Sequence, residues 1–405
     1  MGVIWVVAEA MKRGFRNGDP DWCNLGQGQP EVGTIEGAPE RISTINLEPH
    51  DHAYGPIGGT DEMRQLVADH YNRLYRRDRA SKYTRDNVTV ASGGRLTLSR
   101  VFATLGAVRV GYQVPDYTAY EDMLDYHRYR ITPVAVPTTV ESGFVTPATQ
   151  LDRVVRDRRL DAFLLSNPCN PTGQLVRDDE LAGYVRIARE RHCTMILDEF
   201  YSHFVYTPAG AAGAGPVSGA AFVEDVERDS VLLIDGLTKS FRYPGWRLGW
   251  VVGPADVIEL VNRAASAIDG GPSTAVQRAA CQVLEPARAD RETTALRSVF
   301  VRKRNLMLER LRAMGIVCPH APGGTFYVWA DIGNLPPPLN DADRFFRAAL
   351  DRKVLTVPGR FFDVNPGGER VNGQEYQRWV RFSFGPPADN VRLGLDRLAE
   401  LIAEA

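Results

Sequence analysis

The 405-residue sequence contains little cysteine and no closely spaced cysteine pair. Its thiols are scattered and odd in number: Cys23, Cys169, Cys193, Cys281 and Cys318. A disulfide framework needs paired cysteines, and common zinc sites use cysteines separated by two residues. The sequence therefore argues against both, predicts no metal site, and favours a reducing, cytoplasmic location.

Long apolar runs and an excess of one charge are also missing. No uncharged apolar stretch approaches the roughly 18 residues of a membrane-spanning helix. The apolar segment 3–11 is followed at once by Lys12 and Arg13, which fits an N-terminal helix better than a signal peptide. Lys and Arg total 48 against 50 Asp and Glu, so bulk charge attracts neither nucleic acid nor a membrane surface. We expect a small-molecule partner.

Short apolar runs bounded by turn residues alternate with amphipathic stretches between about residues 88 and 253. This alternation predicts an α/β fold with a mainly parallel, doubly wound sheet, whose sites lie at the carboxyl ends of strands. The Ala/Gly-rich segment 208–221 resembles a mobile surface insertion.

A charged helical stretch begins at about residue 288 and ends near Gly315, where a glycine stop is expected. The strand and helix patterns after it predict one antiparallel layer in a smaller α+β lobe, which the first residues complete. The expected domains are 1–48 and 288–405 (linker helix and C-terminal part) for the small lobe and 49–287 for the large one.

Lys239 follows the apolar run 230–237 and precedes Arg247 by eight residues, among glycines and aromatic residues. A lysine at the end of a strand, taken alone, fits a solvated cation. With these neighbours it also fits carbonyl chemistry, because a buried amine near a cation has a lowered pKa and condenses with aldehydes. Arg247 would supply the cation and could bind a phosphate as a fork.

Polar residues follow two other apolar runs. Asp198 ends the run 193–197 and is either a helix N-cap or a buried carboxylate that keeps a pyridine nitrogen protonated. Tyr201 is either a core residue or a donor to the oxygen of the same ring. Asn170, between two prolines, is either part of an ordinary turn or a second donor to that oxygen.

Two glycines, Gly93 and Gly94, join a predicted strand to a predicted helix that starts near Arg95. Backbone N–H groups at a helix N-terminus bind phosphate through unpaired donors and the helix dipole. Ordinary strand-to-helix turns have the same pattern, so the two glycines indicate a phosphate site only together with the other motifs.

Together these motifs resemble the class I/II aminotransferase family, the aspartate-aminotransferase-like group of fold type I pyridoxal-5'-phosphate (PLP) enzymes. The resemblance covers nearly the whole chain, in the family's order. It implies a large domain with a mainly parallel seven-stranded sheet flanked by helices, plus a smaller α+β domain. The segments that carry it are GQGQPE (26–31), YGPIGGTDEMR (54–64), SGGR (92–95), PDYTAY (115–120), NPCNPTG (167–173), DEFY (198–201), TKSFRYPGWRLGW (238–250), PGGTFYVW (322–329) and RFSFG (381–385).

The resemblance also implies roles for individual residues. Lys239 carries the cofactor as a Schiff base and acts as general base, and Asp198 pairs with the pyridinium nitrogen. Arg381 clamps the substrate α-carboxylate, and Gly28 approaches the same group. The other implied cofactor contacts are Tyr117 on the ring face, Asn170 and Tyr201 at the ring oxygen (Asn170 also facing substrate), and Gly93, Gly94, Arg95, Thr238 and Arg247 around the phosphate.

Two positions affect the phosphate site further. Tyr54 matches a tyrosine that reaches the phosphate of the neighbouring subunit, which implies a homodimer. Gly236 stands where the family usually has a serine that contributes a hydroxyl to the phosphate. Thr238, Ser273 and Thr274 are open as replacements for that hydroxyl.

The implied reaction moves an α-amino group between an amino acid and a 2-keto acid by a ping-pong mechanism. Cyclases and β- or γ-elimination and replacement enzymes use the same fold and stay open as alternatives. A PLP-binding transcription regulator would carry an N-terminal winged-helix domain, whereas only about 20 residues precede the first motif. The acidic residues Glu31, Asp51 and Asp269 could favour a cationic substrate side chain or could be ordinary surface residues.

Overall fold

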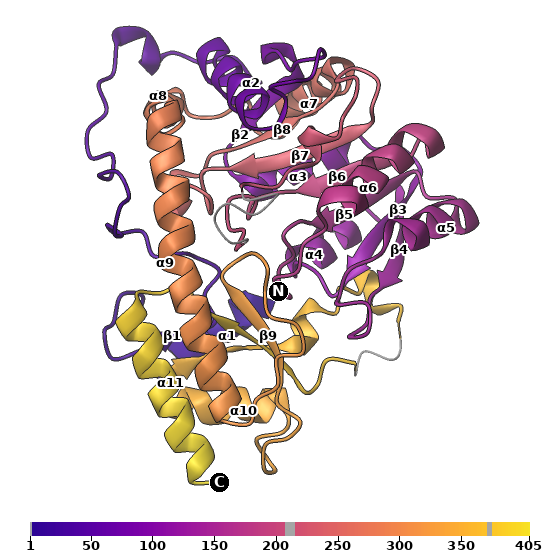
Figure 1. Ribbon diagram of the computed structural model, residues 1–405. Coiled ribbons are helices and arrows are strands. Elements are labelled where there is room, and N and C mark those ends of the chain that lie inside the picture. The colour runs from indigo at the N-terminus through magenta and orange to yellow at the C-terminus, as the bar shows by residue number, and fades with distance from the viewer. Residues whose placement is uncertain (1, 207–214, 371–374) are drawn as a thin grey trace.

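The computed structural model describes residues 2–206, 215–370 and 375–405, which form two lobes (Figure 1). The upper lobe in Figure 1 contains a large sheet, and the lower lobe contains shorter strands. A long helix, α9 (Pro286–Ala313), runs along both lobes. Of the segment predicted as an insertion, residues 208–214 lie outside the described part of the chain.

The large sheet has seven strands in the order β2-β8-β7-β6-β5-β3-β4. Only β8 runs antiparallel to its neighbours, β2 and β7, so the prediction of a mainly parallel seven-stranded sheet is confirmed. The strands are β2 (Val88–Ala91), β3 (Val108–Val114), β4 (Ile131–Pro137), β5 (Ala162–Ser166), β6 (Thr194–Asp198), β7 (Val231–Gly236) and β8 (Gly249–Val252).

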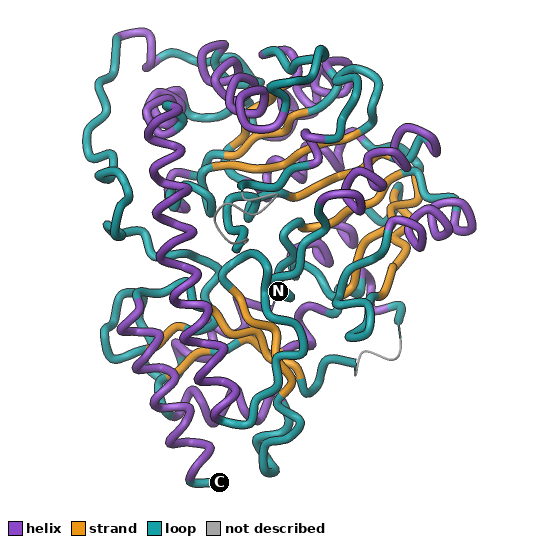
Figure 2. Tube along the Cα trace, in the orientation of Figure 1, coloured by secondary structure: helices purple, strands orange, loops and turns teal. Residues whose placement is uncertain are grey.

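Helices cover both faces of this sheet (Figure 2). Along β5, Leu164 belongs to one buried cluster with α3, α4 and α7, whereas its neighbours Phe163 and Leu165 belong to another with α2, α5 and α6. Successive side chains of a strand point to opposite faces, so this strand is apolar on both. The helices are α2 (Asp61–Tyr75), α3 (Gly94–Thr104), α4 (Ala119–Tyr126), α5 (Ala148–Arg158), α6 (Asp178–Arg191) and α7 (Ala255–Ile268).

The lower lobe contains two small sheets. An antiparallel sheet has the order β11-β12-β9, and β1 pairs with β10 in parallel. The expected single antiparallel layer is therefore wrong for β1 and β10, because the chain changes partner at the buried Thr356, between β10 and β11. The strands are β1 (Cys23–Asn24), β9 (Tyr327–Asp331), β10 (Val354–Leu355), β11 (Val357–Pro358) and β12 (Trp379–Ser383).

The remaining helices complete the two lobes. α1, α10 and α11 belong to the lower lobe, and α8 precedes α9 (Figure 1). Their bounds are α1 (Gly2–Met11), α8 (Thr274–Val283), α10 (Ala342–Asp351) and α11 (Ala388–Ala403). Short 3-10 helices are η1 (Pro49–His52), η2 (Arg85–Asn87), η3 (Gly219–Ala221), η4 (Pro244–Trp246), η5 (Gly359–Phe362) and η6 (Pro366–Gly368).

Helix α9 connects the two cores. Near its start Ala289 packs in the cluster of the large sheet, whereas Met307 and Leu311 pack in the cluster that includes the lower lobe. The Glu285 side chain accepts hydrogen bonds from the first free N–H groups, and Gly315 follows the helix with a φ of 78°. The predicted helix and its glycine stop are confirmed, and the domain boundaries stay a prediction.

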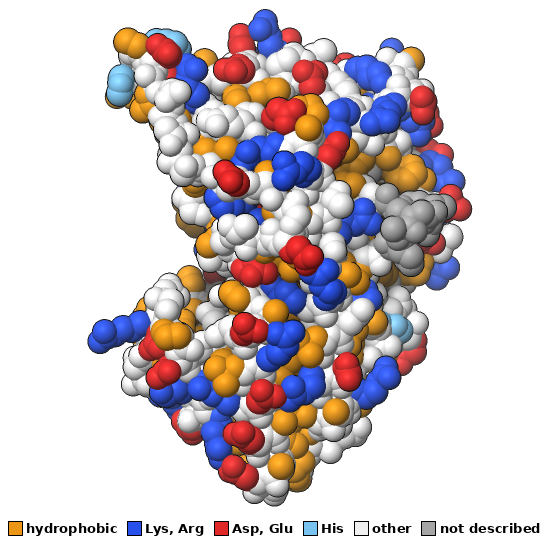
Figure 3. Space-filling model, turned by 60° about the vertical axis from the view of Figure 1, so that its left-hand side comes forward, with side chains coloured by type: hydrophobic (Ala, Val, Ile, Leu, Met, Phe, Trp, Pro, Cys, Tyr) orange, Lys and Arg blue, Asp and Glu red, His pale blue; other side chains and the backbone are white. Residues whose placement is uncertain are grey.

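The described surface carries both signs of charge. Figure 3 shows Lys and Arg interspersed with Asp and Glu over one face of the molecule. Among the described residues, no helix is at once long and apolar enough to cross a membrane.

Candidate active site

A cavity of about 400 Å³ opens where β5, β6 and β7 end, next to β9 and β12 of the lower lobe. Every site residue predicted from the sequence lines it, except Gly93 and Tyr54. The lining residues are Val3, Gly28, Gln29, Gly94, Arg95, Leu98, Tyr117, Thr118, Ser166, Asn170, Asp198, Phe200, Tyr201, Thr238, Lys239, Pro244, Arg247, Tyr327 and Arg381.

Lys239 lies three residues beyond the end of β7 and reaches across to the lower lobe, where its Nζ donates to the Gly28 carbonyl. Burial, together with the charges of Arg381 and Arg247, lowers the pKa of this amine from 10.5 to about 7. A substantial fraction of the amine is therefore neutral near pH 7, the form that acts as nucleophile and base.

Asp198 ends β6 and is buried. Its Oδ2 accepts a hydrogen bond of 2.8 Å from the Tyr120 hydroxyl. Burial raises the pKa of this carboxyl to about 6, against the lowering effect of Tyr120, the Phe200 N–H and Lys239. A cation bound beside it in the cavity would favour its ionised form.

Asn170 and Arg381 face each other across the two lobes. Arg381 donates from Nη1 to Asn170 Oδ1 at 2.8 Å and from Nη2 to the Gly26 carbonyl at 2.7 Å. Because its oxygen is used in this way, Asn170 keeps its amide N–H groups as donors.

Arg381 is buried, and no carboxylate of the described residues forms an ion pair with it. Its Nε is also buried and has no hydrogen-bond partner there. The guanidinium lies 4.1 Å from the centre of the Tyr327 ring. An unpaired buried guanidinium is costly unless an anion joins it, so the arrangement fits a carboxylate in the cavity.

Arg247 lines the cavity and lies against Gly93, which does not line it itself. Gly93 has a φ of 95°, and a Cβ built on it would lie 2.3 Å from Arg247 Nη2. Any side chain at this positive φ would be strained, and it would also displace the end of Arg247. Gly94 follows as the first residue of α3, so the free N–H groups of that helix and the Arg247 guanidinium meet at one end of the cavity.

The hydroxyl of Thr238 is buried beside Lys239 without a partner among the described residues. Gly236 cannot carry a side chain in this backbone, because a Cβ would lie 2.4 Å from the Leu248 carbonyl oxygen. Of the alternatives that the sequence left open, Ser273 caps α8 by accepting from Val276 N–H, and neither Ser273 nor Thr274 lines the cavity.

Tyr117 and Tyr201 lie on the cavity wall with Arg95. Arg95 Nε donates to the Tyr117 hydroxyl at 3.3 Å. The Tyr201 and Tyr327 hydroxyls are 2.8 Å apart. Tyr54 lies outside this group and is fully exposed.

Tyr120, Ser166 and Tyr327 were not among the residues predicted for the site. Tyr120 bonds to Asp198, Ser166 and Tyr327 line the cavity, and Ser166 Oγ accepts from the Asn170 N–H at 3.1 Å. Tyr120 and Tyr327 lie inside segments that the sequence analysis singled out, whereas Ser166 directly precedes one. No sequence pattern pointed to Val3, which α1 brings to the cavity from the start of the chain.

The acidic residues considered for a cationic substrate do not line the cavity. Each is paired with a cation of the same chain instead, and that pairing accounts for its charge. The pairs are Glu31 with Lys303, Asp51 with Arg278, and Asp269 with Arg100. None of the three therefore faces the cavity of its own subunit, and their selection of a cationic side chain stays a prediction without support from this cavity.

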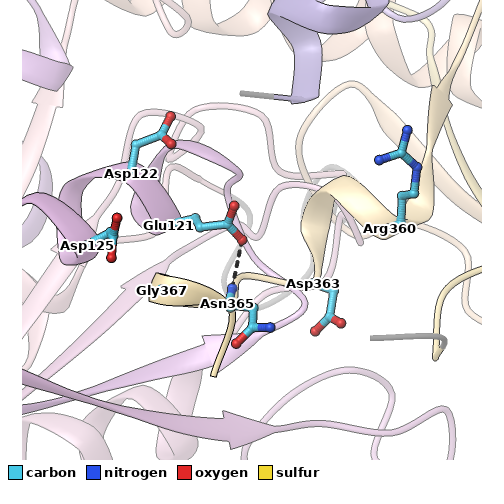
Figure 4. A pocket seen from close by; sticks show the side chains of 8 residues that line it. Glu121, Asp122, Asp125, Arg360, Asp363, Asn365 and Gly367 are labelled. Atoms are coloured by element: carbon cyan, nitrogen blue, oxygen red, sulfur yellow. Dashed lines mark hydrogen bonds between the residues drawn. The ribbon is translucent and has the colours of Figure 1, made fainter. Parts of the chain in front are cut away.

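A second cavity, of about 480 Å³, lies between α4, η5 and η6 (Figure 4). Carboxylates make up much of its wall, and the Asn365 N–H donates to Glu121 at 2.8 Å. None of the described residues lining it is a predicted site residue, and none is a lysine. The cavity around Lys239 is therefore the candidate active site.

Comparison with known proteins agrees with this geometry. A family model described as aminotransferase class I and II matches residues 20–398. An aspartate aminotransferase of Sulfurisphaera tokodaii is 27% identical over 94% of this chain and 89% of its own length. An aspartate/prephenate aminotransferase of Thermus thermophilus is 28% identical over 99% of this chain and 96% of its own. The solved structure of a Thermus thermophilus aspartate aminotransferase with maleate matches with a TM-score of 0.80 at 26% identity, covering 99% of this chain and 96% of that one.

Proposed function

Because the chain belongs to the class I and II aminotransferase family, we propose that its cavity binds PLP at Lys239 and moves the amino group of an α-amino acid to a 2-keto acid. The chain is an aminotransferase, and the family depends on PLP. The observation that carries the assignment to this cavity is the amine of Lys239, whose pKa is lowered to about 7, beside the guanidinium of Arg381, which has no carboxylate partner among the described residues.

The residues of the cavity fit the cofactor. The start of α3 and Arg247 offer donors to a phosphate, whereas the Gly93 N–H donates to the Ala91 carbonyl, and Thr238 offers a buried hydroxyl that has no partner among the described residues. Asp198, at the end of the next strand, is a buried carboxylate suited to a protonated ring nitrogen. When bound, PLP supplies an aldehyde that carries the amino group and a ring that accepts the electrons of the broken Cα–H bond.

Arg381 binds the substrate and Lys239 moves its proton. Arg381, held by Asn170 and Gly26, binds the α-carboxylate as a fork and so orients the Cα–H bond. Lys239 holds the cofactor between turnovers, and its free amine moves the proton at Cα. Its lowered pKa suits that task, because a base works best when its pKa is near the operating pH.

Asn170 and Tyr201 are the proposed donors to the ring oxygen, and Tyr117 the residue on the ring face. Arg95 contributes a backbone N–H at the phosphate, since it is the second residue of α3. Gly28, whose carbonyl accepts from Lys239, keeps the backbone close to the substrate carboxylate.

We also propose a homodimer in which Tyr54 serves the partner's phosphate. Residues 43–50 are all exposed, and Figure 1 shows the segment between β1 and α2 projecting from the body of the subunit. Ile45, Leu47 and Tyr54 are exposed on it, and a second copy of the chain would cover them. A cytoplasmic location stays a prediction.

Borohydride reduction tests the lysine assignment. The purified protein should be yellow, and reduction should fix a pyridoxyl group on Lys239, identified by peptide mapping. Lys239→Ala should lose proton abstraction, and the Lys303→Ala variant, which removes another buried lysine, should still be labelled at Lys239. A label on any other lysine contradicts the proposed site.

The type of reaction is tested by incubation with one amino acid and no keto acid. An aminotransferase stops after about one equivalent and restarts when a 2-keto acid is added, because the cofactor retains the amino group. Cyclisation, elimination or replacement needs no acceptor and continues. The relatives reported above are all named as aminotransferases, and none of these comparisons favours the alternatives.

A further inference from the structure

Tyr327 has no role in the function proposed above, although it lies in the segment 322–329, one of those that resemble the family. It is the first residue of β9, is fully buried, and lines the cavity. A Cβ built on Gly28 would lie 3.5 Å from its hydroxyl oxygen. The hydroxyl therefore faces the loop to which Lys239 donates its hydrogen bond.

The Tyr327 hydroxyl is 2.8 Å from the Tyr201 hydroxyl. Burial raises the pKa of both phenols, so both stay protonated near neutral pH. Each phenol carries one hydroxyl hydrogen, and the hydrogen bond between the two hydroxyls uses one of these two hydrogens. No other hydrogen bond is found for either hydroxyl among the described residues, so the second hydrogen is free to point into the cavity.

Lys239 Nζ lies 5.9 Å from the centre of the Tyr201 ring, and Arg381 lies closer to the ring of Tyr327. The Arg381 guanidinium lies 4.1 Å from the centre of that ring. A cation on the ring face withdraws electron density from the phenol, which makes Tyr327 the better donor. The bond then runs from Tyr327 to Tyr201, and the hydrogen left for the cavity belongs to Tyr201.

We propose that Tyr327 is a positioning residue, which donates to Tyr201 and thereby directs the Tyr201 hydroxyl hydrogen into the cavity while its ring supports Arg381. Tyr327 thus couples the donor to the cofactor ring oxygen with the clamp for the substrate carboxylate. The inference rests on the proposed function, since it assumes that the ring oxygen lies near Tyr201.

A double-mutant cycle tests the coupling between the two hydroxyls. Tyr201→Phe removes the donor, and Tyr327→Phe removes only the group that orients it. We expect each single variant to lower kcat, by about two- to tenfold for Tyr327→Phe. In the Tyr201→Phe background, Tyr327→Phe should have no further effect, because no donor is left to orient. Independent structural roles would instead multiply the two losses.

The absorbance of the bound cofactor tests the same inference without any measurement of turnover. A donor to the ring oxygen stabilises the charge left on that oxygen when the neighbouring nitrogen loses its proton, so removing the donor raises the pH midpoint of the absorbance change of the lysine-bound cofactor. Tyr327→Phe should shift this midpoint upward by about half a pH unit. Tyr201→Phe should shift it further, and the double variant should match Tyr201→Phe.

The support of Arg381 by the ring is tested separately. Tyr327→Phe keeps the ring and should leave the Kd of a 2-keto acid unchanged, whereas Tyr327→Leu removes the ring and should raise that Kd severalfold. Tyr184→Phe removes a buried hydroxyl of α6 that donates to the Thr146 carbonyl, and it should change neither the Kd nor the absorbance midpoint. Thermal unfolding of the cofactor-free variants identifies any loss of fold.

The outcomes separate the inference from the function on which it rests. If borohydride fixes no cofactor on Lys239, the proposed function fails and the inference fails with it. If the cofactor is fixed there but the two Phe variants have multiplying effects, or Tyr327→Phe leaves the midpoint unchanged, the inference alone is overturned. A Tyr327→Leu variant that binds the 2-keto acid as well as wild type overturns the role of the ring.

Discussion

At the scale of single residues, the cavity is defined by buried charges without matching partners. Within the described part of the chain, neither Arg381 nor Asp198 forms an ion pair, and Lys239 is a buried amine near the cations Arg381 and Arg247. Each arrangement costs free energy in the empty cavity. Ligands of opposite charge relieve that cost, so the residues that destabilise the fold are the ones that bind.

Arg381→Lys should show how much the fork geometry contributes. Lysine keeps the charge but cannot donate to a carboxylate through two parallel N–H groups. Losing one charge-assisted hydrogen bond costs about 1.5–3 kcal/mol, so kcat/KM should fall about tenfold to a hundredfold in steady-state assays. Arg378→Lys is the control and should stay near wild type. Arg378 directly precedes β12, which carries Arg381, and it is paired with Asp331 on the surface.

Lys239 should make the stability of the cofactor-free protein depend on pH. Its pKa is about 7 when folded and returns to its ordinary value of about 10.4 when unfolded. Below pH 7 both states are protonated and the folded state bears the full cost of the buried charge. Between the two pKa values the unfolded state binds more protons, so the stability contributed by this group rises with pH.

The Lys239→Met variant removes that cost. Its melting temperature should exceed that of the wild type most clearly at pH 6, and the difference should shrink as the pH approaches 10. Thermal unfolding of both cofactor-free proteins across this range measures it. Lys12→Met, at an exposed lysine, is the control, and a difference between Lys239→Met and wild type that does not vary with pH would refute the lowered pKa.

At the scale of elements, the close approach of β7 and β8 shapes the phosphate end of the cavity. Gly236 pairs with Gly249 across the two strands, and a Cβ on Gly236 would lie 2.6 Å from the Gly249 Cα. The backbone leaves no room for the serine that the family usually has. The neighbouring hydroxyl, on Thr238, is buried in the cavity instead.

Gly236→Ser should therefore destabilise the protein rather than improve cofactor binding. Overpacking of this kind costs about 1–3 kcal/mol, which urea unfolding of the cofactor-free protein would measure. Gly245→Ser places the same side chain at a glycine with nothing within 4 Å and should leave stability within about 0.5 kcal/mol. If Gly236→Ser instead binds PLP more tightly with unchanged stability, β8 moves to make room for the side chain and the prediction is wrong.

At the scale of the whole molecule, the cavity draws on both lobes. Lys239 and Asp198 come from the large lobe, whereas Arg381, Gly28 and Tyr327 come from the small one. α9 packs in both cores and so holds the two halves of the site together. Neither lobe contains both the proposed base and the proposed carboxylate clamp.

If Tyr54 completes the partner's site, subunits with different lesions should complement each other. Mixing Tyr54→Phe with Lys239→Ala subunits produces heterodimers with one site free of both changes and one site carrying both. Activity should then rise above that of the unmixed variants. Activity that follows the fraction of each subunit as in isolated monomers, or a monomeric mass for the active enzyme in sedimentation, would contradict a shared site.

Much of the fold was predictable from local patterns. Apolar runs at strand length, the glycine stop at Gly315 and the amphipathic last helix predicted elements that the structure contains, because strand alternation and helix caps depend on neighbours in the chain. The division of residues 354–358 between two sheets was not predictable. It depends on which distant strand, β1 or β12, lies alongside each half.

The sequence by itself determined which chemical groups are present and which of them follow strands: Lys239, Asp198, Asn170 and the glycines before α3. Only the tertiary structure decided how they are partnered. It paired Glu31, Asp51 and Asp269 with cations and gave Arg381 no carboxylate partner among the described residues. It also brought Tyr327 to Tyr201 over 126 positions. Burial and pairing depend on contacts between distant segments, and these set the pKa of Lys239 and the direction of each donor.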